Sequence, residues 1–188
     1  LRKYMPITFW TFLISSLAIS GIFPFSGFFS KDEILAAAFE HNKVLWVIAS
    51  IASLMTAFYM FRLVFLTFTG EFRGTEEQKH HLHESPALIT FPLVVLALLA
   101  AVGGVMGMPE VFGVDHYLKN FLNPLFAGSA HIGEHAAHLP HATEWALMGG
   151  AFLGAVLSIG YAYMKYVSGK ALPAKEGEEK GLGKVVYN

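Results

Sequence analysis

Four long runs of apolar residues constrain the fold of this 188-residue chain more than any other feature. They are residues 7–29, 44–68, 86–107 and 145–167. Each run is long enough to cross about 30 Å of hydrocarbon as a helix of ~20 residues. The third run has no charged residue, and the second and fourth have one each, Arg62 and Lys165. The sequence therefore predicts an all-α membrane protein with four transmembrane helices.

The composition agrees with a lipid bilayer as the solvent. Hydrophobic residues make up 54% of the chain and charged residues only 14%, whereas soluble domains carry about 25% charged residues. The formal net charge of −1 argues against a nucleic-acid partner bound through counterion release. The chain has no cysteine, which excludes disulfides, thiolate metal sites and iron–sulfur ligands. Because the first residue is Leu1, we expect a processed product or a fragment.

The first apolar run contains residues that interrupt helices. Gly21 and Gly27 permit non-helical backbone angles, and Pro24 lacks a backbone N–H donor. We therefore expect a helix break at residues 23–29. Two half-helices that meet inside the membrane, as in transporters, would make the first crossing discontinuous.

A charged triplet follows this break. Ser30 and Glu33 match the capping-box pattern, which predicts that helix restarts at Lys31 with Ser30 as the cap. Lys31, Asp32 and Glu33 would then lie at a half-helix N-terminus inside the membrane, where ionisable groups are functional candidates. Lys31 is the candidate proton carrier. Alternatively, the first helix leaves the membrane at Phe29, and the triplet belongs to an ordinary interfacial cap on a short surface helix.

A secretory signal peptide is a competing interpretation of the start of the chain. Arg2 and Lys3 precede an apolar run, as they do in such peptides. However, the apolar residues continue to Phe29, and no hydrophilic domain follows. We therefore favour a membrane-spanning start.

Polar segments separate the apolar runs and suggest their orientation. We expect a discontinuous transmembrane helix at 1–43, a transmembrane helix at 44–69, a polar cytoplasmic loop at 70–85, a transmembrane helix at 86–107, an amphipathic and His-rich outer loop at 108–144, a transmembrane helix at 145–167 and a polar cytoplasmic tail at 168–188. Lysine and arginine are concentrated at one side of these spans, which places both ends of the chain in the cytoplasm. That side receives Arg2, Lys3, Arg73, Lys79, Lys165, Lys170, Lys175, Lys180 and Lys184, and the other receives Lys43 and Lys119.

The outer loop has several histidines at nearly helical spacing. They are His131, His135, His138 and His141. Imidazole clusters can bind divalent ions, but Pro140 interrupts the run and no cysteine accompanies it. We expect a solvated loop and no metal site.

Two motifs resemble a known family. Residues 20–35, SGIFPFSGFFSKDEIL, and residues 55–65, MTAFYMFRLVF, closely resemble the L subunit of respiratory complex I, the antiporter-like subunit called subunit 5 in mitochondria. The resemblance covers residues 1–107 strongly and 145–188 loosely. It implies that the chain is a C-terminal-region fragment whose tail leads toward a lateral helix that is missing here.

The resemblance implies a proton-translocating helical bundle of the antiporter type. It assigns proton transfer to Lys31, with the acidic Asp32 and Glu33 beside it. It favours a bundle-facing, ion-pairing role for Arg62, which could otherwise extend its stem to the cytoplasmic surface. The paired Glu and Lys of the family's upstream helices fall outside the chain, so the fragment would hold the exit half of a proton path.

The resemblance also implies that the chain acts only as a subunit of NADH:quinone oxidoreductase, without a catalytic residue or redox centre of its own. FMN, iron–sulfur clusters and quinone would belong to other subunits. The expected partners are the bilayer and the membrane-arm subunits, especially the adjacent antiporter-like one, in the inner (plasma) membrane of a bacterium. The alternatives are the large subunit of a multisubunit Na⁺/H⁺ antiporter, a related hydrogenase complex, and a non-transporting assembly segment.

Overall fold

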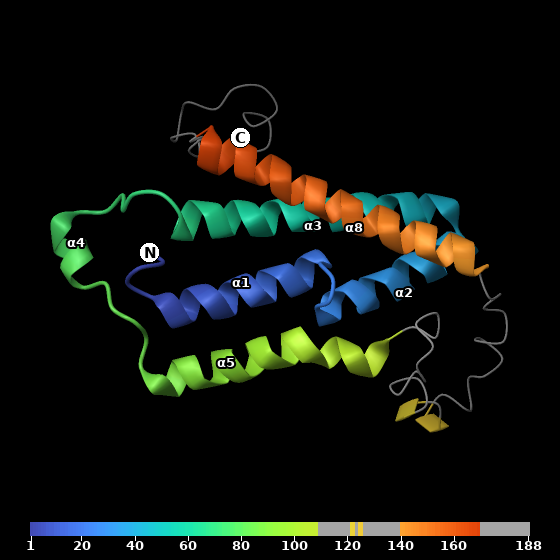
Figure 1. The fold of residues 1–188 in the computed structure, drawn as a ribbon, viewed down its shortest axis with the longest axis horizontal. Helices are drawn as coiled ribbons and strands as arrows, with labels where there is room; N and C mark the ends of the chain where they lie inside the picture. The colour runs from blue at the N-terminus through green and yellow to red at the C-terminus, as the bar shows by residue number, and fades with distance from the viewer. Residues whose placement is uncertain (109–120, 123, 126–139, 170–188) are drawn as a thin grey trace, which may run out of the picture.

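A computed structural model of the protein describes residues 1–108, 121–122, 124–125 and 140–169. Its long helices lie lengthwise beside one another, and the chain runs back and forth along them (Figure 1). In order they are α1 (Pro6–Ser20), α2 (Ser26–His41), α3 (Lys43–Phe68), the short α4 (Glu76–His80), α5 (Ala87–Val102) and α8 (His141–Tyr163). A 3₁₀ turn, Gly103–Gly107, extends α5, and a π-helical turn, Met164–Ser168, extends α8.

Among the residues that the structure describes, three helical segments are long and apolar enough to cross a membrane. They are Lys43–Phe68, Ala87–Gly107 and His141–Ser168. Many of their large apolar side chains face outward, and Leu88, Phe91 and Leu157 are each at least 71% exposed. Such a surface suits hydrocarbon, in which helices satisfy their own backbone hydrogen bonds. The predicted class, an all-α membrane protein, is confirmed.

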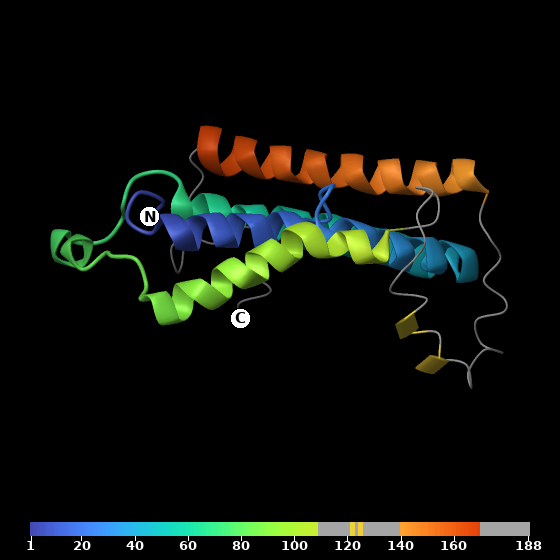
Figure 2. The same ribbon diagram turned by 60° about the horizontal axis from the view of Figure 1, so that its bottom comes forward.

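Helices α1 and α2 are each too short to cross the membrane alone. They have 15 and 16 residues, which is about 22–24 Å of helix. Both pack against α3, and they follow one another along its length in both views (Figures 1 and 2). The expected discontinuity of the first apolar run is therefore present.

The interruption comes earlier than the sequence predicts. Helix α1 ends at Gly21, whose φ of 76° is left-handed and suits a residue without a side chain. The N–H of Gly21 reaches the carbonyl of Ala18 at 3.0 Å, which closes the last turn. Residues 21–25, including Pro24, are non-helical, and the Phe23–Pro24 peptide bond is cis. The break is thus at 21–25 rather than at 23–29.

The prediction that Ser30 caps a helix beginning at Lys31 is wrong. Helix α2 begins at Ser26 after Phe25, and the hydroxyl of Ser30 donates to the carbonyl of Ser26 at 3.4 Å, from inside the helix. Gly27 lies so close to the carbonyl oxygen of Ala18 on α1 that a Cβ there would overlap it. The lack of a side chain on Gly27 therefore permits α2 to begin this early. Gly27 therefore belongs to α2 and not to the break.

The start of α1 is held by a side chain from far along the sequence. The carboxylate of Glu84, in the connection before α5, accepts hydrogen bonds from the N–H groups of Ile7 at 2.7 Å and Thr8 at 3.3 Å. It also accepts the Thr8 hydroxyl at 2.6 Å. Burial opposes ionisation, but these hydrogen bonds outweigh it and hold the pKa of Glu84 below its ordinary value. The contact ties α1 to the chain that leads into α5.

The two ends of the bundle differ in their number of lysines and arginines. The N-terminus, the ends of α3 and α8 and the start of α5 share one end, the left in Figure 1, which we call the N-terminal end. The start of α3 and the start of α8 lie at the opposite end. Among the described residues, the N-terminal end holds Arg2, Lys3, Arg73, Lys79 and Lys165, and the opposite end holds Lys43.

Candidate functional site

Lys31 lies beside the break between α1 and α2. Its aliphatic stem passes Gly21 so closely that a Cβ on Gly21 would be 3.1 Å from Lys31 Cδ. Its Nζ donates a hydrogen bond to the hydroxyl of Ser53 on α3 at 3.3 Å. Lys31 is half-buried and lies in the second turn of α2, not at its N-terminus as predicted. The lysine thus joins three parts of the bundle: the break, α2 and α3.

Aromatic packing determines where α2 holds this lysine. Phe28 and Phe29 are 6% and 2% exposed and form a buried cluster with Met148 of α8. The 3₁₀ turn after α5 also packs against Phe29, so closely that a Cβ on Gly104 would overlap the Phe29 ring. The two rings therefore fix the first turn of α2 between α8 and the end of α5, and Lys31 follows one turn later.

The acidic residues beside Lys31 have different environments. Asp32 is only 8% exposed, whereas Glu33 is exposed. Successive residues of a helix point about 100° apart, so the triplet does not share one face. The charges that act on Asp32 are Glu144, in the first turn of α8, and Glu33. Glu144 also lies 3.5 Å from Nδ1 of His141. The sequence analysis missed Glu144 because it is distant from Asp32 along the chain.

Arg62 is not part of this group. Its side chain is exposed, and its guanidinium carbon lies 5.7 Å from the ring centroid of Tyr166, in the π-helical turn after α8. Arg62 is nine residues beyond Ser53 on α3, which corresponds to about 13 Å of helix. The structure places it near the N-terminal end in a cation–π contact, and away from Lys31.

A cleft of about 490 Å³ lies between α2, α3 and α8, next to the Lys31 site. Its walls are mostly apolar, and its hydroxyl groups belong to Ser50, Ser53 and Thr143. Ser53 therefore faces both Lys31 and this cleft. Ser53 shares the apolar run 44–68 with Ser50, Thr56 and Thr67, so no sequence signal singled it out.

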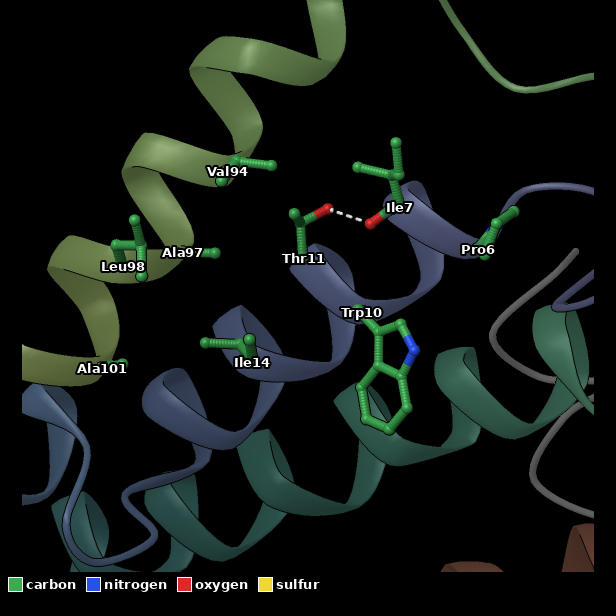
Figure 3. A pocket seen from close by; sticks show the side chains of 9 residues that line it. All are labelled: Pro6, Ile7, Trp10, Thr11, Ile14, Val94, Ala97, Leu98 and Ala101. Atoms are coloured by element: carbon green, nitrogen blue, oxygen red, sulfur yellow. Dashed lines mark hydrogen bonds between the residues drawn. The ribbon is translucent and has the colours of Figure 1, made fainter.

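A second cleft, of about 320 Å³, lies between α1 and α5 (Figure 3). Trp10, Ile14 and Val94 are among its lining residues, and the one hydroxyl, that of Thr11, donates to the carbonyl of Ile7 on its own helix at 2.9 Å. The hydroxyl is thus already bonded. This cleft is a lipid-compatible groove without a free ionisable group among its lining residues.

The predicted histidine run, outer loop and tail fall largely outside the residues that the structure describes. Residues His131, His135 and His138, most of the outer loop and the tail beyond residue 169 lie outside the described residues. His141 is described, at the start of α8. Within the described ranges, no three His, Asp or Glu residues are placed so that they could hold a metal ion.

Comparisons with known proteins give consistent matches. Residues 1–57 match the family described as NADH:quinone oxidoreductase/Mrp antiporter, TM. Chain 5 of the NAD(P)H-quinone oxidoreductase of Picosynechococcus sp. is 44% identical over 95% of this chain and 29% of the relative. Subunit L of the F(420)H(2) dehydrogenase of Methanosarcina mazei is 36% identical over 88% of the chain and 27% of the relative. Subunit L of the NADH-quinone oxidoreductase of Rickettsia bellii is 38% identical over 57% of this chain and 17% of the relative. The chain spans less than a third of the length of these relatives.

Proposed function

Because this chain belongs to the family of antiporter-like subunits that includes chain 5 and subunit L of NAD(P)H-quinone oxidoreductases, we propose that it is a proton-translocating part of the membrane arm of such a complex. The position of Lys31 carries this proposal. An ammonium lies within the helical bundle, between a helix break and a serine of the neighbouring helix. Ionisable groups at such places typically serve ion pathways.

The proposed role of Lys31 is to take up a proton and release it toward the opposite end of the bundle. Asp32 and Glu33 tune this exchange through their charge, since a nearby carboxylate favours the charged form of a lysine. We assign no proton-transfer role to Arg62, because its contact is with Tyr166 at the N-terminal end. The fragment then supplies the exit half of a path whose entry half belongs to the preceding part of the subunit.

We further propose that α1 and α2 together form one discontinuous crossing, which gives four crossings with α3, α5 and α8. The N-terminal end would face the cytoplasm of a bacterium, since its lysines and arginines outnumber those at the opposite end. A cysteine at Glu77 should then react with an impermeant thiol reagent from the cytoplasmic side, and one at His141 from the other side. Reaction of both from the same side would contradict this topology.

The redox chemistry of the complex is proposed to occur in other subunits. FMN, iron–sulfur clusters and quinone would be bound there, and this chain would respond through its contacts with the adjacent antiporter-like subunit. The lack of cysteine in the sequence supports this division, because iron–sulfur clusters are held by cysteine thiolates.

A Na⁺/H⁺ antiporter subunit is the second candidate, because the matched family includes Mrp antiporters. The two candidates differ in what drives ion movement. If the chain belongs to an oxidoreductase, an electron donor whose oxidation reduces quinone should drive proton movement into vesicles that contain the complex. If it belongs to an antiporter, added Na⁺ should exchange for protons without any electron donor. Donor-independent exchange in vesicles would favour the antiporter.

Substitution of Lys31 tests the main proposal in the intact complex. Lys31→Met removes the titrating group, so donor-driven proton uptake into membrane vesicles should be largely lost while the complex still assembles. Lys31→Arg should not rescue uptake, because a guanidinium hardly releases a proton. Lys43→Met is the matched control, since Lys43 lies at the end of the bundle with its ammonium over the Phe39 ring. Normal uptake by an assembled Lys31→Met complex would refute the proposal.

A further inference from the structure

Ser53 connects Lys31 to the cleft between α2, α3 and α8. Its hydroxyl accepts the hydrogen bond from Lys31 Nζ at 3.3 Å, and the same residue lines the cleft.

The hydroxyl groups of the cleft lie between Lys31 and the end of the bundle opposite the N-terminal end. Ser50 and Ser53 are three residues apart on α3, so they lie on the same helix face about 4.5 Å apart along the axis. Ser50 is the nearer of the two to the start of α3, and Thr143 lies in the first turn of α8 at that same end. The cleft therefore extends from Ser53 to the end of the bundle away from the N-terminus.

The cleft is large enough for water, and three hydroxyl groups in its mostly apolar walls supply polar partners. Its volume of about 490 Å³ is many times the space that one water needs. Apolar cavities remain dry, but the three hydroxyl groups can bond the first waters at Ser53, Ser50 and Thr143. Glu144 directly follows Thr143 of the cleft lining in the first turn of α8, and a carboxylate there favours the passage of a cation.

We propose that Ser53 and this cleft form the route by which Lys31 exchanges its proton with the opposite end of the bundle. The inference rests on the proposed role of Lys31. In the exchange, the N–H bond of the ammonium breaks with its electron pair left on nitrogen, and Ser53 Oγ takes the proton. The hydroxyl passes its own proton to a water in the cleft. Lysine becomes neutral, serine is regenerated, and the water becomes hydronium.

Two shape-matched substitutions test the role of the hydroxyl. Ser53→Thr and Ser53→Val replace serine by two side chains of nearly equal shape, of which only threonine keeps the hydroxyl. Donor-driven proton uptake should persist in Ser53→Thr and be mostly lost in Ser53→Val, with both complexes assembled. Equal uptake by the two variants would overturn the relay. Thr56→Val is a control on the same helix, because the Thr56 hydroxyl bonds the carbonyl of Ala52 at 2.8 Å, and it should retain uptake.

Filling the cleft tests the route independently of the hydroxyl. Gly150 lines the cleft and Gly149 does not, yet a Cβ on either would meet nothing within 4 Å. Gly150→Leu should therefore block proton uptake, and Gly149→Leu should not, although both replace a glycine of α8 by the same residue. Equal uptake in the two variants would show that protons do not use this cleft.

Accessibility of the cleft separates this inference from the proposed function. Residues 1–188 contain no cysteine, so Ser50→Cys introduces one defined thiol into this part of the subunit, and the complex without the substitution gives the background labelling. A small charged methanethiosulfonate should modify it from the side opposite the cytoplasm, and Gly150→Leu should slow that reaction. A Ser50→Cys thiol that remains unreactive would refute a hydrated cleft. If Lys31→Met abolishes uptake in the same membranes, the proposed function survives and only the route fails.

Discussion

Two short junctions of the bundle, between α2 and α3 and between α1 and α2, are built differently. At the turn between α2 and α3, the side-chain carbonyl of Asn42 accepts the N–H groups of Val44 at 2.8 Å and Leu45 at 3.4 Å. At the break between α1 and α2, the residue before the helix is Phe25, and no side chain caps the first turn. One junction is stabilised by a local polar cap, and the other by packing.

The difference follows from where each junction lies. Asn42 is at an end of the bundle, where a polar residue meets water or lipid headgroups and one side chain can satisfy the exposed donors. The break lies partway along the bundle, where Gly21 supplies a left-handed turn and Gly27 permits contact with Ala18. A capped junction only reverses the chain. The packed junction also leaves room for the stem of Lys31, so it can place an ionisable group inside the bundle.

The most severe way to disturb the packed junction is Gly27→Ala. Its Cβ would overlap the backbone carbonyl of Ala18, which cannot move as a flexible side chain can. Overpacking of this kind costs about 1–3 kcal/mol, so we expect a clear loss of assembled complex and of its thermal stability in detergent. Gly103→Ala is the control, since nothing lies within 4 Å of its Cβ. Equal stability of the two variants would mean that the junction is not held by this contact.

Gly21→Ala should have a smaller effect on stability and a distinct effect on function. A non-glycine residue at φ 76° costs about 1–2 kcal/mol. The added Cβ would also lie 3.1 Å from Lys31 Cδ and displace the lysine stem. Proton uptake for each assembled complex should therefore fall, as measured in vesicles normalised for complex content. Unchanged uptake at normal content would separate Lys31 from the break.

The capped junction predicts a modest and purely structural effect. Asn42→Ala removes the acceptor for two N–H groups and should cost about 1 kcal/mol of stability, visible as a small shift in thermal unfolding with uptake for each complex unchanged. Asn42→Asp should preserve the cap. Ser30→Ala serves as the comparison, because the hydroxyl of Ser30 caps no helix, and it should have almost no effect. A larger effect at Ser30 than at Asn42 would reverse the assignment of the caps.

The sequence alone determined the class of the protein and the existence of a break. Both depend on local properties: the length of apolar runs, the absence of an N–H on Pro24 and the backbone freedom of Gly21. Lys31 could be selected as a candidate for the same reason, because a charge in an apolar segment is visible without a structure.

Only the tertiary structure decided where α2 begins and which groups meet Lys31. A capping pattern at Ser30 could not compete with a start at Ser26 that packs Gly27 on Ala18, and that contact joins two different helices. Ser53 lies 22 residues from Lys31, and Glu84 lies 77 residues from Ile7, whose N–H it accepts. Periodicity and propensity describe neighbours on one helix. The hydrogen bonds that define this site and anchor α1 join separate helices and connections, so they depend on how the helices pack together.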